Sequence, residues 1–190
     1  MRRRRSRSSV TADAPTHEQL LPLVEAASGV ADHSSLRPWR LIELRGTARG
    51  RLGDAFVAAS GLDPHSKDAR KLAEKPLRAS LLIAVVCSPT PSFKVPEWEQ
   101  EAVASGVAHI LSLLLDEAGW GVMWRTGGHT RAAEVARMHG LADHERLLGW
   151  LYVGGVKTSE RGGKPRKLAN PERVLSVLGV SGLGEDASAP

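Results

Sequence analysis

The chain has 190 residues, of which 42% are hydrophobic and 25% are charged, and these values are typical of one globular domain. Cys87 is the only cysteine, so the composition excludes an intrachain disulfide. No apolar run approaches the ~18 residues that a membrane-spanning helix requires. We therefore expect a single cytoplasmic domain with tails, in which Cys87 is a buried core thiol.

The net charge of +5 comes from one end of the chain, where five arginines lie within the first seven residues. Outside this cluster, basic and acidic residues are equal in number. Guanidinium groups form paired hydrogen bonds with phosphate oxygens, and Ser6 and Ser8 add hydroxyl donors beside Arg4 and Arg5. The cluster therefore suits a phosphate group. The alternative is a solvated arm without a fixed partner, because terminal charge runs are usually disordered.

In the first half of the chain, the apolar spacing predicts three helices and two strands. Thr16 and Gln19 have the spacing of a capping box, which marks the start of the first helix. The run that ends at Cys87 is apolar and rich in β-branched residues, as expected of a central strand. The expected elements are helices at residues 16–29, 48–59 and 63–75 and strands at residues 39–45 and 80–87.

The second half begins with the longest predicted helix, residues 96–118. Because this helix is apolar nearly all round, we expect it to be buried, either centrally or in a dimer interface. The elements expected after it are strands at residues 119–124 and 147–154, helices at residues 130–139 and 170–178, and a basic loop at residues 157–167. This irregular alternation is typical of an α+β or three-layer α/β domain with about four strands.

Several common functional motifs are absent from the sequence. The phosphate-loop pattern, the Rossmann glycine pattern and the cysteine and histidine spacings of zinc sites do not occur. No set of residues indicates a Ser-His-Asp triad or a pair of catalytic carboxylates. The sequence therefore predicts no metal site and no side-chain nucleophile.

Five segments, in order along the chain, resemble one known family. They are Arg4-Arg5-Ser6-x-Ser8, the segment from Ala31 to Arg40, the segment from Lys94 to Glu101, the segment from Gly119 to Gly127, and the segment from Leu148 to Gly154. Together they cover roughly residues 3–156. They are similar to the minimal, short-chain bacterial branch of the nitroreductase family, whose members are FMN-dependent oxidoreductases.

The resemblance implies a fold, a set of domains and a set of cofactor-binding residues. The fold is α+β and three-layered, with a mixed sheet of about four strands and a long central helix. The domain boundaries are a basic segment at residues 1–10 that joins the FMN site, an FMN-binding domain at residues 11–156, and an extension with a short helix and a flexible tail at residues 157–190. The cofactor-binding residues are Arg4, Arg5, Ser6, Ser8, His33, Trp124, Arg125 and Thr126.

Some of these positions keep a second interpretation, and some depart from the family. Asp32, beside His33, suits a capping role in the following turn. Trp124 is equally consistent with core packing. Arg125 directly follows a buried strand, so its charge needs a partner. Gly29 stands where the branch usually has an arginine. In the family a helix precedes the Arg-Arg-Ser segment, whereas this sequence begins just before Arg4, so either the true start lies upstream or the protein lacks that helix.

The resemblance implies hydride transfer from NAD(P)H through FMN to a nitroaromatic, a quinone or a similar small acceptor, in a ping-pong cycle in which the flavin carries the chemistry. It also implies a homodimer with each flavin between the subunits, and residues 103–115 are the candidate interface. Neither a nucleic acid nor a membrane is expected as a partner. Two alternatives remain open at this point: a non-catalytic flavin sensor or carrier, and a nucleic-acid-binding module that uses the arginine arm.

Overall fold

A four-stranded sheet forms the centre of the molecule in the computed structural model, which describes residues 4–158 and 168–178. The strands are β1 (Trp39–Leu44), β2 (Leu81–Cys87), β3 (Trp120–Arg125) and β4 (Arg146–Gly155), in the order β1-β2-β4-β3. All three pairings are antiparallel. The four strands are as predicted, but the expectation of a mixed sheet is wrong.

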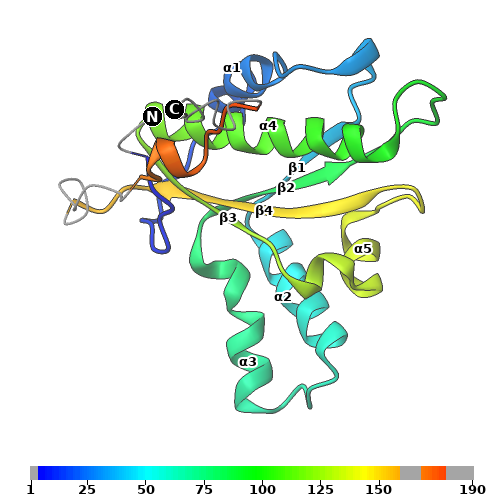
Figure 1. The fold of residues 1–190 in the computed structure, drawn as a ribbon. Coiled ribbons are helices and arrows are strands. Elements are labelled where there is room, and N and C mark those ends of the chain that lie inside the picture. The colour runs from blue at the N-terminus through cyan, green and yellow to red at the C-terminus, as the bar shows by residue number, and fades with distance from the viewer. Residues whose placement is uncertain (1–3, 159–167, 179–190) are drawn as a thin grey trace, which may run out of the picture.

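The antiparallel pairing of β1 with β2 has a visible cause in the chain between them. Helices α2 (Thr47–Ser60) and α3 (Lys67–Ala73) form a hairpin that leaves the sheet and returns to it (Figure 1). The chain therefore re-enters beside the end of β1, where Leu44 pairs with Leu82. Gly53 allows the two helices to pack closely, because a Cβ atom there would overlap the backbone carbonyl of Ala73.

Helices cover both faces of the sheet and make three layers (Figure 1). On one face lie α1 (His17–Ala27) and the long helix α4 (Glu97–Glu117), and on the other lie α2 and α5 (Ala133–His139). All seven residues of β2 are buried between these layers, as the apolar run predicted. Burial raises the pKa of the Cys87 thiol to about 11, which agrees with a core thiol.

Local sequence signals account for most helix boundaries. The Thr16 side chain accepts from the Gln19 N–H while the Gln19 side chain accepts from the Thr16 N–H, which confirms the predicted capping box. The predicted helix at residues 63–75 begins later than expected, at Lys67. The reason is that the Asp63 carboxylate accepts from the His65 N–H in a turn, and Ser66 then caps the helix.

Helix α4 agrees closely with its predicted span. Its buried face packs against the sheet and α1, and consists of Val103, Ala104, Val107, Ala108, Leu111 and Leu115. Most apolar side chains of residues 103–115 therefore fill the protein's own core. Trp98, at the start of this helix, is in contrast 71% exposed in the single chain, so of the two expected places for the helix, the core or a dimer interface, Trp98 does not lie in the core.

The C-terminal region is described only in part. Residues 168–178 contain the short 3₁₀ helix η5 (Pro171–Arg173) instead of a helix through residue 178. The Asn170 side chain caps it by accepting from the Glu172 N–H. The predicted basic loop lies mostly, and the predicted flexible tail of the last dozen residues entirely, outside the described residues.

A paired charge holds the loop before β4 against β1, and it makes a prediction for acid stability. Arg40 Nε and Nη2 each donate to a Glu145 carboxylate oxygen at 2.6 Å, and this lowers the pKa of Glu145 to about 2. Because the folded pKa lies below the ordinary value of 4.5, Glu145 stabilises the fold above pH 4.5, and this contribution is lost as the pH falls towards 2.

We expect Glu145→Gln to lower the urea midpoint at pH 7, and we expect the difference from the parent to shrink between pH 4.5 and pH 2. Urea unfolding at a series of pH values measures both effects. Glu134→Gln is the control, because the Glu134–Arg137 pair lies on the surface of α5 and surface pairs contribute little. A difference that is the same at pH 7 and pH 2 would contradict the prediction.

Candidate functional site

The N-terminal segment lies against the β3–β4 end of the sheet. The Arg7 N–H donates to the Val122 carbonyl at 2.9 Å, and the Thr11 N–H donates to the Gly155 carbonyl at 2.8 Å. Val10 packs against the core cluster on the α2 face of the sheet. Residues 7–13 are therefore packed against the sheet and are not a solvated arm.

Glycines in β3 and β4 make room for this segment. A Cβ atom on Gly121 or Gly154 would come within 3 Å of the Val10 side chain, and one on Gly155 would overlap the Thr11 hydroxyl. The N-terminal segment and the two strands are distant in sequence, yet the space that the glycines leave is filled by Val10 and Thr11. Arg4 and Arg5 are half-buried here, whereas Ser6 and Ser8 are exposed.

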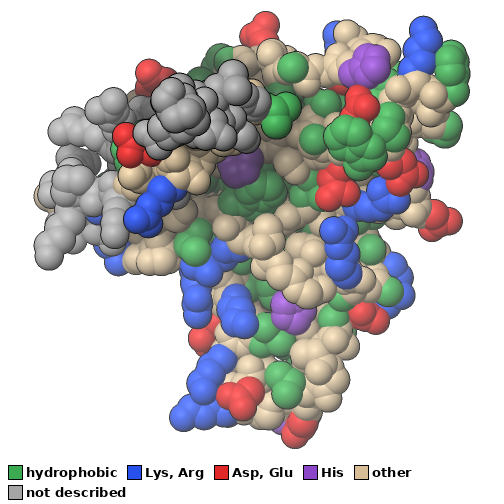
Figure 2. All heavy atoms as spheres, in the orientation of Figure 1, with side chains coloured by type: hydrophobic (Ala, Val, Ile, Leu, Met, Phe, Trp, Pro, Cys, Tyr) green, Lys and Arg blue, Asp and Glu red, His purple; other side chains and the backbone are tan. Residues whose placement is uncertain are grey.

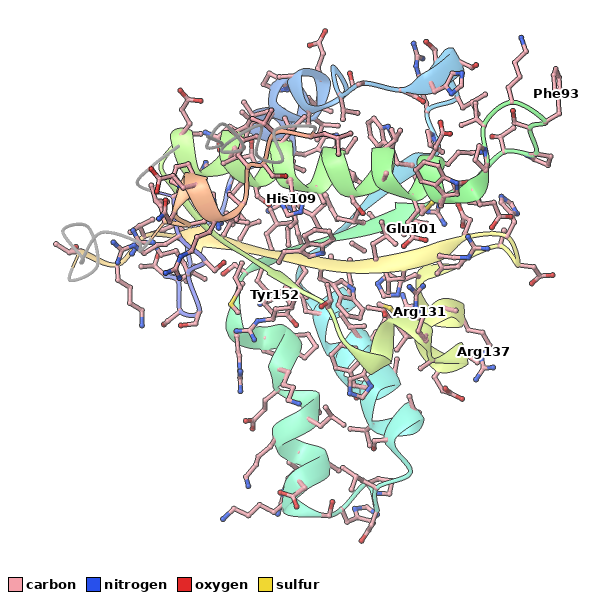
Figure 3. All side chains as sticks on the ribbon, viewed as in Figure 1. Phe93, Glu101, His109, Arg131, Arg137 and Tyr152 are labelled. Atoms are coloured by element: carbon pink, nitrogen blue, oxygen red, sulfur yellow. The ribbon has the colours of Figure 1, made fainter. Side chains whose placement is uncertain are left out.

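A cavity of about 390 Å³ opens on the same face of the sheet, at the end of β3. Tyr152 lies on this face, below the sheet in Figure 3, whereas His109 lies on the α4 side. The lining residues are Phe56, Lys75, Arg78, Met123, Trp124, Arg125, Thr126, His129, Trp150 and Tyr152. The wall is thus aromatic and cationic, and none of these residues has a carboxylate.

The end of β3 carries two buried donors without acceptors among the described residues, Trp124 Nε1 and Arg125 Nε. The Trp124 ring packs edge-on against His109, with ring centroids 5.0 Å apart, while the Arg125 guanidinium lies 5.1 Å from the Tyr152 ring centre. Trp124 therefore both packs in the core and borders the cavity. Arg125 has an aromatic ring as its partner, with no carboxylate paired to it in the described part of the chain.

Gly149 in β4 allows close contact between β4 and the end of β3. Its φ is 134°, which favours glycine, and a Cβ atom there would overlap the Arg125 carbonyl and lie 2.7 Å from Trp124 Nε1. β4 therefore approaches the end of β3 more closely than any other residue type would permit.

Burial and the cations set the protonation states in the cavity. Burial raises the pKa of Tyr152 to about 12, although Arg125 and Arg78 oppose the rise. Burial and the charge of Lys75 lower the pKa of His129, whose ring stacks on Phe56 at 4.6 Å. At neutral pH the tyrosine therefore keeps its proton and the histidine is mostly uncharged, so the charges in the lining come from Lys75, Arg78 and Arg125.

His33 occupies a different place. It lies in the 3₁₀ helix η1 (His33–Ser35), with Nδ1 3.0 Å from a Glu99 carboxylate oxygen, and it lines a separate cavity of about 540 Å³ beside Trp98. Asp32 precedes η1 but its side chain makes no capping hydrogen bond to it; instead, the Asp32 carboxylate accepts from the Arg37 N–H at 2.7 Å, beyond the end of η1. Within one chain, the structure does not bring His33 to the cavity at the end of β3.

Reasoning from the sequence found Trp124, Arg125 and Thr126 but missed most of the cavity wall. The missed residues are Phe56, Lys75, Arg78, Met123, His129, Trp150 and Tyr152. One signal was available: Lys75 and Arg78 flank Pro76 in a short turn, η2 (Lys75–Arg78), directly before a buried strand. Figure 2 shows Lys and Arg side chains gathered near the junction of this turn with the sheet.

The described residues show neither a metal site nor a membrane-spanning helix. These residues contain no group of three or more histidine, cysteine or acidic side chains that could hold a metal ion. None of their helices is long and apolar enough to cross a membrane.

Comparison with known proteins shows what the chain is related to. The Nitroreductase family matches residues 1–155. The Escherichia coli (strain K12) protein YdjA, named as an NAD(P)H nitroreductase, is 33% identical over 154 residues, which are 80% of this chain and 83% of YdjA.

Solved structures share the fold. A nitroreductase-like family protein from Bacillus cereus has a TM-score of 0.81 and 21% identity, over 93% of this chain and 92% of its own. The FMN and NADPH-dependent nitroreductase NfnB from sphigopyxis sp. strain HMH has a TM-score of 0.64 and 19% identity, over 93% of this chain and 96% of its own. The family match and the identity with YdjA establish that the chain belongs to the nitroreductase family of oxidoreductases.

Proposed function

We propose that the protein is a cytoplasmic, FMN-dependent NAD(P)H oxidoreductase that reduces a nitroaromatic, a quinone or a similar small acceptor. The observation that carries this proposal is the cavity at the end of β3. It combines an aromatic wall, three cations and a buried donor without an acceptor, Arg125 Nε, and it lies on the same face as Val10, in the segment that follows the arginines.

The residues present fit the chemistry of FMN. This cofactor has a phosphate dianion, a polar ribityl chain and a flat ring with polar atoms along one edge. Arg4, Arg5, Ser6 and Ser8 supply donors for the phosphate and the ribityl chain. Phe56 and Trp150 meet edge to face at 5.3 Å and offer apolar surface to the ring.

Arg125 Nε is the buried donor available to the ring's polar edge, whereas the Trp124 ring packs against His109 on the α4 side. A buried donor without an acceptor is costly, and a ligand oxygen or nitrogen would relieve that cost. Beyond Thr126, a Cβ atom added to Gly127 or Gly128 would meet nothing within 4 Å, so space remains beside the strand end for a flat group.

When bound, FMN supplies the chemistry by accepting a hydride from a nicotinamide and passing it to the acceptor. The chain's own residues bind and orient. Arg125 places positive charge where negative charge develops on a reduced ring. Phe56, Trp150 and Tyr152 exclude water from one side. Neutral His129 and protonated Tyr152 add no opposing negative charge.

We also propose that the protein works as a homodimer, in which His33 serves a site shared between the subunits. The support is the exposed aromatic surface around His33 on the α4 side. Trp98 is 71% exposed there and lines the His33 cavity together with Ala102, which is also exposed. A second copy of the chain would cover this surface and carry His33 towards the partner's flavin.

We expect the protein to take up FMN in preference to FAD, and the Arg4→Ala, Arg5→Ala double variant to bind FMN about 2–4 kcal/mol more weakly, because two charge-assisted contacts are lost. Titration of the flavin-free protein with FMN, followed by flavin fluorescence, measures the affinity. Acid release and chromatography identify the flavin that the purified protein carries.

The double variant Lys67→Ala, Arg70→Ala is the matched control. It removes the same charge from the exposed side of α3 and should leave the FMN affinity unchanged. Recovery of FAD alone would refute the choice of cofactor. Equal affinities in the parent and the Arg4, Arg5 variant would remove the arm from the site.

A further inference from the structure

The cavity at the end of β3 carries more positive charge than FMN alone requires. Its lining has three cations and no carboxylate. Elsewhere in the described part of the chain, cations such as Arg40, Arg45 and Arg146 are paired with carboxylates. Lys75, Arg78 and Arg125 have no such pair among the described residues. Exposed cations on α3, such as Lys67 and Arg70, also have no paired carboxylate among the described residues, so the distinguishing feature of Lys75, Arg78 and Arg125 is that they line one cavity that contains no carboxylate.

The three cations act on the cavity from different sides and at different depths. Arg125 is partly buried at the strand end and lies over Tyr152, whereas Lys75 and Arg78 are exposed and stand at the rim, in η2. The pKa shifts show that their charges reach across the space. Lys75 lowers the pKa of His129, and both Arg125 and Arg78 favour the ionised form of Tyr152.

The demand of FMN accounts for only part of this charge. Under the proposed function, on which this inference rests, the arginine arm binds the phosphate, and Arg125 serves the polar edge of the ring. Lys75 and Arg78 are then left at the mouth of the cavity without a counter-charge. A ligand that enters over this rim meets two cations and aromatic walls.

We propose that the acceptor is an aromatic molecule with its own anionic group, such as a carboxylate, and that Arg78 and Lys75 bind that group at the rim while the ring enters the cavity. Arg78 is the more specific of the two, because a guanidinium group can form two parallel hydrogen bonds with a carboxylate. The pair therefore determines which acceptors the enzyme selects.

The test compares 4-nitrobenzoate with its methyl ester, which has the same nitroaromatic ring without the charge. Dissociation constants come from the change in flavin absorbance when each compound is added to the oxidised, FMN-loaded protein without NAD(P)H. We expect the parent to bind 4-nitrobenzoate at least roughly tenfold more tightly than the ester, as one charge-assisted contact implies. The ratio of kcat/KM for the two acceptors should follow the same order.

Arg78→Gln should reduce this preference about tenfold and leave the affinity for the ester unchanged. Lys67→Gln is the matched control, since it removes an exposed cation from α3, outside the cavity lining, and should keep the parent's preference. Equal binding of the acid and the ester, or the same preference in Arg78→Gln and the parent, would overturn the proposal. The proposal would also be overturned if Arg78→Gln lost affinity for NADPH but kept the parent's preference for the acid over the ester. The rim would then bind the nicotinamide donor and not the acceptor.

The two proposals fail separately. If NADPH and NADH never reduce the flavin, the proposed function is wrong, but the binding comparison in the oxidised protein still decides whether the rim selects an anionic aromatic ligand. If the flavin is reduced but the protein binds the acid no more tightly than the ester, the proposed reductase function is retained and only the proposed anionic acceptor is wrong.

Discussion

Leu111→Asp is expected to abolish the folded state of the protein or to lower its stability by more than about 4 kcal/mol. Leu111 is 0% exposed and lies on the face of α4 that packs on the sheet. The substitution removes a large apolar side chain and places a carboxylate where no cation from the core cluster can pair with it. Circular dichroism during thermal and urea unfolding measures the effect.

Ala102→Asp is the control for the helix itself. Ala102 is exposed on the same helix, so this variant introduces the same side chain without burying it, and the fold should survive. A soluble Leu111→Asp protein with the parent's size and melting temperature would contradict the core position of α4. If only the Ala102 variant dissociated a dimer, with its melting temperature retained, the exposed surface beside Trp98 would be the interface.

Rapid mixing of the FMN-loaded protein with excess NADPH or NADH is expected to bleach the flavin absorbance, and Arg125→Gln should slow this bleaching about tenfold to a thousandfold. The physical reason is that Arg125 supplies positive charge at the end of β3, where the ring gains negative charge on reduction. Some flavin should remain bound, because the phosphate contacts of the arm are unchanged. Stopped-flow absorbance gives the rate, and steady-state turnover should give parallel double-reciprocal lines.

Arg70→Gln, on the exposed side of α3, is the control and should reduce the flavin at the parent's rate. The test of His33 is different, because His33 lies in a separate cavity of the same chain. His33→Ala should slow the reduction only in the dimer, where a partner's flavin comes within reach. If neither nicotinamide bleaches the parent protein, the protein is a flavin sensor or carrier and not a nicotinamide-dependent reductase.

The amino-acid sequence by itself determined the local features of this protein. The capping box at Thr16, the buried run of β2 and the span of α4 were predicted because each depends on residues within a few turns of one another. The segment from Trp124 to Thr126 was found in a different way, through its resemblance to the nitroreductase family. Residue types alone also suggested that the arginine arm suits a phosphate.

Only the tertiary structure decided what surrounds these features. Phe56 comes from α2, Lys75 and Arg78 from η2, and Tyr152 from β4, and no periodicity in the chain links them. β1 and β2 are antiparallel because α2 and α3 return the chain to the end of the sheet it had left, which no single segment reveals. Contacts between segments that are distant in sequence determine both the cavity lining and the strand pairing. They arise from the packing of whole elements, so the cavity and its unbalanced charge become visible only when the elements are assembled.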